Sequence, residues 1–517
     1  MTKKKTALKS LAKGSSFLLA STTIGMLLQL VSGVLVIRAV EKSDYGLYSL
    51  AIVVVGMLSS MSLIGFTNGV TQLLSSDKTK KDTCHSWSVI YTAIIIVVFV
   101  SAVAGFSLYL CAGILADSFD KPGLQPIFEF TSYMITPVAL IRVIISIFRG
   151  FSISLPKAIF QDLGTRVIRI AGVLMVLFVS GGLWGVLWAS LVATYITTIM
   201  ISLYAVKKLP VLLEKAEWQW VGGEIVTFSF PLFGASIVII LLTASSTLLL
   251  GYFSQAQEVA IYSAPRPFTK VLELPLLALS FIYLPIATAL YKSDGLEAIK
   301  GLYCSATKWI ALISIPVFLL FFMDSSFLIV LLFGEEYQTS STVLSVLALG
   351  SFSHVIFGPN GMMLITFDKR KDVFFSTVLA AIINISLGIL LIPDMGALGA
   401  AIATACALFI SNTVISYNLY RSTKILPMIK QDAFLLIGIL SIGSLLYWVG
   451  GVLHLDAIIW HILTFMIVCL MCVMGPVLMK TLTTDDVLLL VALERKLLKS
   501  DAFTRRLAKR CGLNDGF

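Results

Sequence analysis

Residues 86–114 read SWSVIYTAIIIVVFVSAVAGFSLYLCAGI, a stretch without a single charged side chain. A helix needs about 20 consecutive apolar residues to cross the hydrocarbon core of a bilayer, so this stretch is long enough to span a membrane. Similar stretches recur along a chain of 517 residues that is 58% hydrophobic and only 13% charged. Soluble domains average about 25% charged residues. The sequence therefore predicts an all-α polytopic membrane protein and excludes a soluble multidomain enzyme.

Short polar segments divide the apolar sequence into fourteen candidate transmembrane helices. They are expected at 15–37, 46–73, 86–114, 127–149, 157–180, 183–206, 225–250, 259–290, 304–323, 340–366, 372–392, 397–419, 433–450 and 457–479.

Lysine and arginine residues predict the orientation of these helices. Of the 38 Lys and Arg residues, 30 lie in or beside alternate loops that include both ends of the chain, and three lie in the opposite loops. Loops on the cytoplasmic side carry such an excess, so both termini are expected in the cytoplasm, with the protein in a bacterial cytoplasmic (inner) membrane. Because the net charge of +10 is spread as a topology signal rather than gathered in one patch, nucleic-acid binding is excluded.

The sequence repeats itself at an offset of 214 residues. This offset places Asp44-Tyr45-Gly46-Leu47-Tyr48-Ser49 on Glu258-Val259-Ala260-Ile261-Tyr262-Ser263, and Gly182-Leu183-Trp184-Gly185 on Gly396-Ala397-Leu398-Gly399. Each repeat holds six predicted helices, so both copies enter the membrane in the same direction, which predicts two parallel lobes around a central cavity. We expect an N-terminal lobe at 1–215, a C-terminal lobe at 216–430, two additional helices at 431–479 and a basic cytoplasmic tail at 480–517.

Ionisable side chains lie inside several of the predicted spans, where they normally face a protein interior or a hydrated cavity. Two groups have i, i+4, i+7 spacing, which places each group on one helix face. The first group is Arg266, Lys270 and Glu273, the second is Asp162, Arg166 and Arg169, and Arg142 adds a further basic residue.

The five basic residues of this set exceed the two acidic ones. Such a surplus predicts a cavity that attracts an anion, and the planar guanidinium of arginine suits phosphate groups because it binds them bidentately. In the alternative interpretation, Asp162 pairs with Arg166 and Lys270 pairs with Glu273 within their own helices. The sequence shows no catalytic triad, metal-ligand cluster or glycine-rich phosphate loop, so no enzyme activity, metal or cofactor is expected.

Several short motifs occur in a characteristic order. They are Arg38 at the end of the first predicted helix, Asp44-Tyr45-Gly46-Leu47-Tyr48, Phe148-Arg149-Gly150, Glu258 to Ser263, Phe333-Gly334-Glu335-Glu336-Tyr337, and Ile392-Pro393-Asp394-Met395-Gly396-Ala397-Leu398-Gly399-Ala400-Ala401. With these motifs, residues 10–425 resemble the polysaccharide flippases, including O-antigen type translocases, of the multidrug/oligosaccharidyl-lipid/polysaccharide (MOP) exporter superfamily.

This resemblance implies a V-shaped pair of six-helix lobes that works by alternating access. The implied function is a secondary transporter that flips polyprenyl-pyrophosphate-linked oligosaccharide from the cytoplasmic to the outer leaflet, with H⁺ or Na⁺ as coupling ion and a polysaccharide polymerase as partner. The cationic cavity of the family fits Arg142, Arg166, Arg169, Arg266 and Lys270 in kind. Asp162 and Glu273 are the candidates for ion coupling.

Two functions are alternatives to a flippase. A cation-coupled multidrug exporter of the same superfamily would need an acidic and aromatic site for cationic drugs, whereas the surplus here is basic. A membrane-embedded polysaccharide polymerase or ligase would carry catalytic residues on a substantial outward loop, and the predicted outward loops are short.

Overall fold

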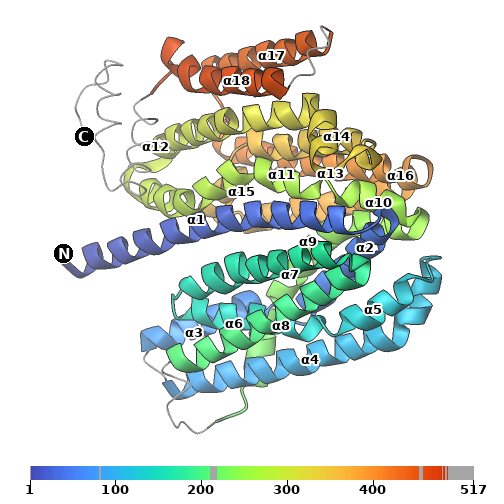
Figure 1. Ribbon diagram of the computed structural model, residues 1–517. Helices are drawn as coiled ribbons and strands as arrows, with labels where there is room; N and C mark the ends of the chain where they lie inside the picture. Colours follow the sequence, from blue (N-terminus) through green and yellow to red (C-terminus); the bar gives the residue numbers. More distant parts are fainter. Residues whose placement is uncertain are drawn as a thin grey trace. The chain divides into compact units, whose positions relative to one another are not determined.

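The computed structural model describes residues 2–80, 83–209, 218–452, 458–479, 481–483 and 486. Every regular element in these ranges is a helix (Figure 1). Ten of the described helices are long and apolar enough to cross a membrane, or eleven if the bent pair α5 and α6 is counted as one span. The chain is thus an all-α, multi-pass membrane protein, as predicted. The count of fourteen spans stays a prediction, and the tail expected at 480–517 lies outside the described residues apart from 481–483 and 486.

The helices pack into two compact units. The first, here called the N-terminal unit, comprises Ala20–Pro267 and Asn384–Ala400. Its helices are α1 (Thr2–Ala39) from residue 20 onward, α2 (Lys42–Met61), α3 (Phe66–Lys80), α4 (Thr83–Ser118), α5 (Leu124–Ser132), α6 (Ile135–Gly150), the π-helix η1 (Lys157–Gly164), α7 (Thr165–Val179), α8 (Gly182–Lys208), α9 (Gly222–Phe253) and α10 (Ala256–Ser263).

The second, here called the C-terminal unit, comprises Met1–Leu19, Phe268–Ile383 and Ala401–Phe517. Its helices are α12 (Leu274–Met323), α13 (Ser325–Phe333), the 3-10 turn η3 (Glu335–Tyr337), α14 (Ser340–Ile356), α15 (Asn360–Thr366), α17 (Lys430–Val452) and α18 (Ile458–Leu478). Three helices contribute residues to both units, namely α1, α11 (Arg266–Leu272) and α16 (Arg370–Thr423). The lobe boundaries expected at 215 and 430 stay predictions.

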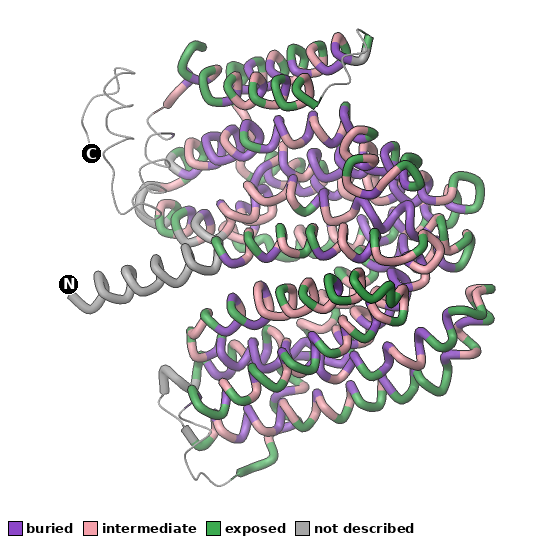
Figure 2. Tube along the Cα trace, viewed as in Figure 1, coloured by how far each residue is buried: buried purple, intermediate pink, exposed green. Residues whose placement is uncertain are grey.

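Helix α4 shows how the apolar sequence is divided between protein and lipid. Its exposed residues recur along one face and are apolar, among them Phe99, Phe106 and Ile114, which are 63–69% exposed (Figure 2). Ile90 and Val97 are fully buried. Large apolar side chains are stable in this exposed position only against an apolar medium, so the outer face of α4 faces lipid.

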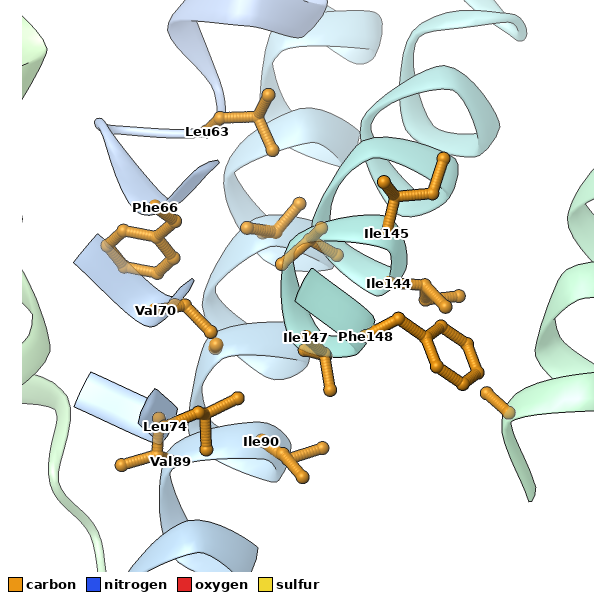
Figure 3. Close-up of a cluster of buried hydrophobic side chains, with 14 of the residues drawn as sticks. Leu63, Phe66, Val70, Leu74, Val89, Ile90, Ile144, Ile145, Ile147 and Phe148 are labelled. Atoms are coloured by element: carbon orange, nitrogen blue, oxygen red, sulfur yellow. The ribbon is translucent and has the colours of Figure 1, made fainter. Parts of the chain in front are cut away.

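The buried side of α4 packs into the core of the N-terminal unit. There α3, α4 and α6 lie together, and Phe66, Val70, Ile90 and Phe148 interdigitate with 0% exposure (Figure 3). In the C-terminal unit a separate core forms where α12 meets α14, α15 and the end of α16. Each unit is therefore stabilised by its own close-packed interior.

Five of the predicted helices are interrupted. Those expected at 46–73, 127–149 and 340–366 break between α2 and α3, between α5 and α6, and between α14 and α15. The helix expected at 259–290 is wrong as one continuous element, because it divides into α10, α11 and α12 at Ala264 and Glu273. Prolines at 265, 267 and 275 lack the backbone N–H that would continue the hydrogen-bond ladder. The helix expected at 157–180 begins instead as the π-helix η1, a wider turn that is often found at functional sites.

The offset of 214 residues also appears in the backbone conformation. The residues that precede α2 and α10, Glu41 and Gln255, are both extended, with ψ of 156° and 162°. Gly182 and Gly396 have positive φ of 55° and 53°, and so do Asp120 (51°) and Gly334 (93°). Positive φ is uncommon outside glycine and marks a specific turn, so its recurrence at one offset extends the repeat from the sequence to the fold.

The equivalent helices α2 and α10 pack closely at Gly46. A Cβ atom on Gly46 would lie 1.8 Å from the carbonyl oxygen of Ala256, whereas a Cβ on Gly56 of the same helix would meet nothing within 4 Å. We expect Gly46→Ala to destabilise the protein by about 1–3 kcal/mol through overpacking. Gly56→Ala is the matched control, and the melting temperature in detergent is the measurement. Equal melting temperatures for both variants would contradict the close α2–α10 contact.

Candidate functional site: an arginine–tyrosine cluster

The beginning of α2 carries two buried tyrosines from the motif Asp44-Tyr45-Gly46-Leu47-Tyr48. Tyr45 is 7% exposed and Tyr48 is 4% exposed, and their ring centroids lie 6.3 Å apart. Because Gly46 lets α10 approach α2 directly, the two rings lie where helices of both repeats meet.

Arg169 of α7 binds Tyr48. Its Nη2 donates a hydrogen bond of 2.7 Å to the Tyr48 hydroxyl, and its guanidinium carbon lies 5.7 Å from the centroid of the Tyr48 ring. The same hydroxyl lies 3.3 Å from Oγ of Ser190 on α8. The Nε of Arg169 is buried and has no hydrogen-bond acceptor among the described residues. Arg169 therefore keeps a donor for which the described part of the protein supplies no acceptor.

Arg266 of α11 is held in a similar way. Its Nη1 donates to Thr247 Oγ1 at 3.0 Å and its Nη2 donates to the Thr243 carbonyl at 2.9 Å, both on α9. Its guanidinium carbon lies 5.6 Å from the centroid of the Tyr262 ring. Tyr262 is the residue 214 positions after Tyr48, so each repeat places one tyrosine ring against one arginine.

The arginines form one group. The charges of Arg169 and Arg266 both act on the hydroxyl of Tyr45, and the charge of Arg169 acts on Arg166. We call this group the arginine–tyrosine cluster; its members are Tyr45, Tyr48, Arg166, Arg169, Tyr262 and Arg266.

Arg166 links the cluster to α1. Its Nη1 donates to the backbone carbonyl of Asp162 at 3.0 Å, and its Nη2 donates to Gln29 Oε1 at 3.1 Å. A Cβ on Gly25 of α1 would lie 2.1 Å from this Nη1, so glycine is what allows the close approach. The Asp162 side chain turns elsewhere and accepts a hydrogen bond of 3.2 Å from Thr22, with the Lys157 ammonium 3.9 Å away.

Of the two ion pairs expected in the alternative interpretation, only one forms. Lys270 and Glu273 do pair, with Nζ 2.9 Å from Oε2. The pair expected between the Asp162 carboxylate and Arg166 is wrong, since Arg166 binds the Asp162 carbonyl instead. The π-helix η1 changes the register between the two residues and thereby removes the simple i, i+4 geometry.

A surplus of positive charge therefore remains in the N-terminal unit, although the Asp162 charge still acts on Arg166. Among the described residues, no Asp or Glu oxygen lies within 4.0 Å of the side-chain nitrogens of Arg142, Arg166 or Arg169. Neutral oxygens of tyrosine, glutamine, serine and the backbone hold these guanidinium groups. Neutral acceptors solvate a cation without cancelling its charge, so an anion could still bind.

The structure does not bring all predicted site residues together. Arg142 of α6 donates a short hydrogen bond to Oγ of Ser60. Ser60 lies twelve residues after Tyr48 on α2, which is about 18 Å along the helix axis. Arg142 is thus in the same unit as the cluster but at a different height along the axis of α2. Lys270 of α11 belongs to the C-terminal unit.

A family described as polysaccharide biosynthesis protein matches residues 11–291. The chain belongs to this family. Over 130 residues it is 27% identical to teichuronic acid biosynthesis protein TuaB of Bacillus subtilis (strain 168), and that match spans about a quarter of each protein, 25% of this chain and 26% of TuaB.

Solved structures share the fold of this polysaccharide biosynthesis protein. Lipid II flippase MurJ in an inward closed conformation has a TM-score of 0.66 at 14% identity, over 88% of this chain and 97% of MurJ. A multidrug resistance MATE family transporter of the MOP superfamily, in its inward-facing conformation, has a TM-score of 0.64 at 15% identity, over 78% and 95%. The family match confirms the resemblance to polysaccharide export proteins at the level of the polysaccharide biosynthesis family, and these structures show that the chain has the fold of MurJ and of a MATE transporter.

Sequence reasoning missed the tyrosines of the site. Tyr45, Tyr48 and Tyr262 were quoted as parts of a repeated motif, but their role as partners of arginine depends on contacts between distant helices. A signal was present, since a tyrosine recurs at the offset of 214 residues within apolar helices. Buried tyrosine hydroxyls usually have a polar partner, and this rule points to the intramembrane arginines.

We expect Tyr48→Phe to lower the stability of this family member by about 1–3 kcal/mol, because the charged donor Arg169 loses its acceptor. Tyr417→Phe is the control, since the Tyr417 ring is 61% exposed. Melting temperatures of the two purified variants test this expectation. A Tyr48→Phe variant as stable as the control would show that the Arg169–Tyr48 hydrogen bond does not stabilise the fold.

Proposed function

We propose that this protein is a secondary transporter that flips polyprenyl-pyrophosphate-linked oligosaccharide from the cytoplasmic to the outer leaflet by alternating access. Membership of the polysaccharide biosynthesis family supports a role in glycan export. The fold shared with a lipid II flippase and with MATE transporters supports transport by a MOP-type mechanism.

The observation that carries this proposal is the surplus of positive charge at Arg166 and Arg169 in the arginine–tyrosine cluster. A pyrophosphate group brings concentrated negative charge, and its transfer into an apolar region without partners would cost many kcal/mol. Arg166 and Arg169 supply guanidinium groups held by neutral oxygens. A cationic drug would be repelled by the same charges, which disfavours the multidrug alternative.

Arg169 is the residue best suited to contact the pyrophosphate. Its Nη2 is occupied by Tyr48, but its buried Nε has no acceptor in the described part of the chain. A phosphate oxygen would provide that acceptor and would add a charge-assisted hydrogen bond. Tyr48 and Ser190 then fix the plane of the guanidinium, so that little conformational entropy is lost on binding.

The other predicted site residues take secondary roles in this proposal. Arg142 would contact the glycan or pyrophosphate at a different depth, and Lys270 would contribute a cation that Glu273 partly neutralises. Asp162 and Glu273 are the proposed sites of coupling to H⁺ or Na⁺. Both termini are proposed to lie in the cytoplasm at the inner membrane, and a polysaccharide polymerase that receives the flipped units is the proposed partner.

We expect Arg169→Ala and Arg266→Ala to reduce surface polysaccharide by about 10–100-fold, because each variant removes a charge-assisted contact of about 1.5–3 kcal/mol. The measurement is polysaccharide display in a deletion strain that expresses each variant at equal protein level, together with lipid-linked intermediates on the cytoplasmic leaflet. Arg370→Ala is the control, since the Arg370 side chain is 77% exposed and lies 3.7 Å from Asp368.

Arg169→Lys separates charge from geometry. Lysine keeps the charge but lacks the planar fork of donors, so display should be intermediate between wild type and Arg169→Ala. Normal display in an Arg169→Ala/Arg266→Ala double variant would refute the anionic substrate. Resistance to cationic drugs in expressing cells would instead favour a multidrug exporter.

Ion coupling has its own test. In proteoliposomes that contain lipid-linked glycan, an imposed H⁺ or Na⁺ gradient should accelerate flipping by the wild type. Asp162→Asn or Glu273→Gln should lose this acceleration, because a side-chain amide does not exchange a proton as a carboxyl group does. Glu297→Gln is the control, since the Glu297 side chain is 85% exposed. Unchanged acceleration in both variants would exclude these two carboxylates as coupling sites.

A further inference from the structure

A second group of buried charges lies in the C-terminal unit. Lys308 of α12 has 0% exposure, and its ammonium group has three oxygen neighbours from different segments. Nζ lies 2.5 Å from Asp486 Oδ2, 2.9 Å from the Thr481 carbonyl and 3.5 Å from Oδ1 of Asp432 on α17. Thr481 and Asp486, which follow α18, are thus fixed to α12 and α17 through one lysine.

The two carboxylates of this group differ in their hydrogen bonding. Asp486 is fully buried and accepts bonds from Trp309 Nε1 at 3.0 Å, from the Thr483 N–H at 2.8 Å and from the Thr483 hydroxyl at 3.0 Å. Asp432 is 2% exposed, and its Oδ1 has no hydrogen-bond donor among the described residues. Asp486 therefore has several hydrogen-bond donors, whereas Asp432 Oδ1 has only the Lys308 ammonium as an ion-pair partner in the described part of the chain, at 3.5 Å.

The charges of the group do not balance. One ammonium faces two carboxylates, which leaves one negative charge in a dry site if all three residues are ionised. The charged groups that act on Asp432 are Lys308 and Asp486. On the packed helix α18, His461 is bound to Asp324 at 2.6 Å near the opposite end, and Lys430 at the start of α17 is exposed. An uncompensated buried charge costs several kcal/mol, and uptake of a proton removes it.

We propose that Lys308, Asp432 and Asp486 form a proton-binding site in which Asp432 carries the proton, and that this site holds Thr481–Thr483 and Asp486, here called the C-terminal segment, against α12 and α17. The ammonium of Lys308 already occupies the position between the carboxylates that a metal ion would take. With the proton bound, the site is neutral and Asp486 retains all its donors. Loss of the proton leaves a net negative site and weakens the attachment of the C-terminal segment.

The sign of the pH dependence follows from proton linkage. A group that binds a proton more tightly in the folded than in the unfolded state makes the fold less stable as pH rises. Asp432→Asn resembles the protonated carboxyl in shape and charge, so it should fold at least as stably as the wild type and should lack this part of the pH dependence. Lys308→Met leaves the two carboxylates without a cation, so the stability of this variant should fall more steeply as the pH rises.

The experiment uses the full-length protein in detergent, with melting temperatures measured from pH 5.5 to 9. We expect the wild type to melt about 2–4 °C below Asp432→Asn at the alkaline end and at the same temperature at the acidic end. Asp368→Asn is the matched control, since the Asp368 side chain is 90% exposed, and it should follow the wild type. Hydrogen exchange of the Thr483 amide should be faster in the wild type than in Asp432→Asn at pH 8.5 and equal at pH 6.

Three results would overturn the proposal. The first is an Asp432→Asn variant that does not fold, because the proposed native state already has a neutral residue there. The second is an identical pH profile for wild type and Asp432→Asn. The third is a melting temperature of the wild type that rises on replacing N-methylglucamine chloride with NaCl while remaining insensitive to pH, which would identify a Na⁺ site instead.

Discussion

Guanidinium groups that are held inside an apolar helical unit by neutral oxygens are the central feature of this protein. Carboxylates would stabilise these cations at the expense of the net charge. The Tyr48 hydroxyl and the Gln29 amide instead provide hydrogen bonds to Arg169 and Arg166 and leave the charge in place. Two close helix contacts position the partners of these arginines. They are the α2–α10 contact at Gly46 and the approach of α1 to Arg166 at Gly25.

The two repeats share a backbone pattern but divide the chemistry unequally. Tyr48 and Tyr262 are equivalent, and each lies against an arginine. The arginines themselves are not equivalent, since Arg166 and Arg169 correspond to Ala380 and Ile383, and Arg266 corresponds to Ile52. The duplicated fold thus places one tyrosine ring against an arginine in each repeat, but the arginines come from helices that are not equivalent. An asymmetric substrate with its charge at one end is compatible with such an uneven distribution.

The charge surpluses of the two units have opposite sign, on half-buried arginines in one and around the buried Lys308 in the other. In the N-terminal unit arginines exceed their acidic neighbours, whereas around Lys308 the carboxylates exceed the cation. The first arrangement favours an anion and the second favours a proton. Both follow from the same rule, that an ionised group in a dry interior requires a compensating partner. The partner is a substrate in the first proposal and a proton in the second.

The apolar stretches and the offset of 214 residues determined that the chain is a duplicated, all-α membrane protein, because hydrophobicity and repetition are local properties of the sequence. They also located the intramembrane arginines. Only the tertiary structure decided which partners those arginines have, since Tyr48 and Arg169 are 121 residues apart and meet where α8 packs against both α2 and α7. The π-helix at Lys157–Gly164 and the burial of Lys308 were likewise decided by packing. Helix periodicity assigns a side chain to a face, but the neighbour of that face is set by contacts between distant parts of the chain.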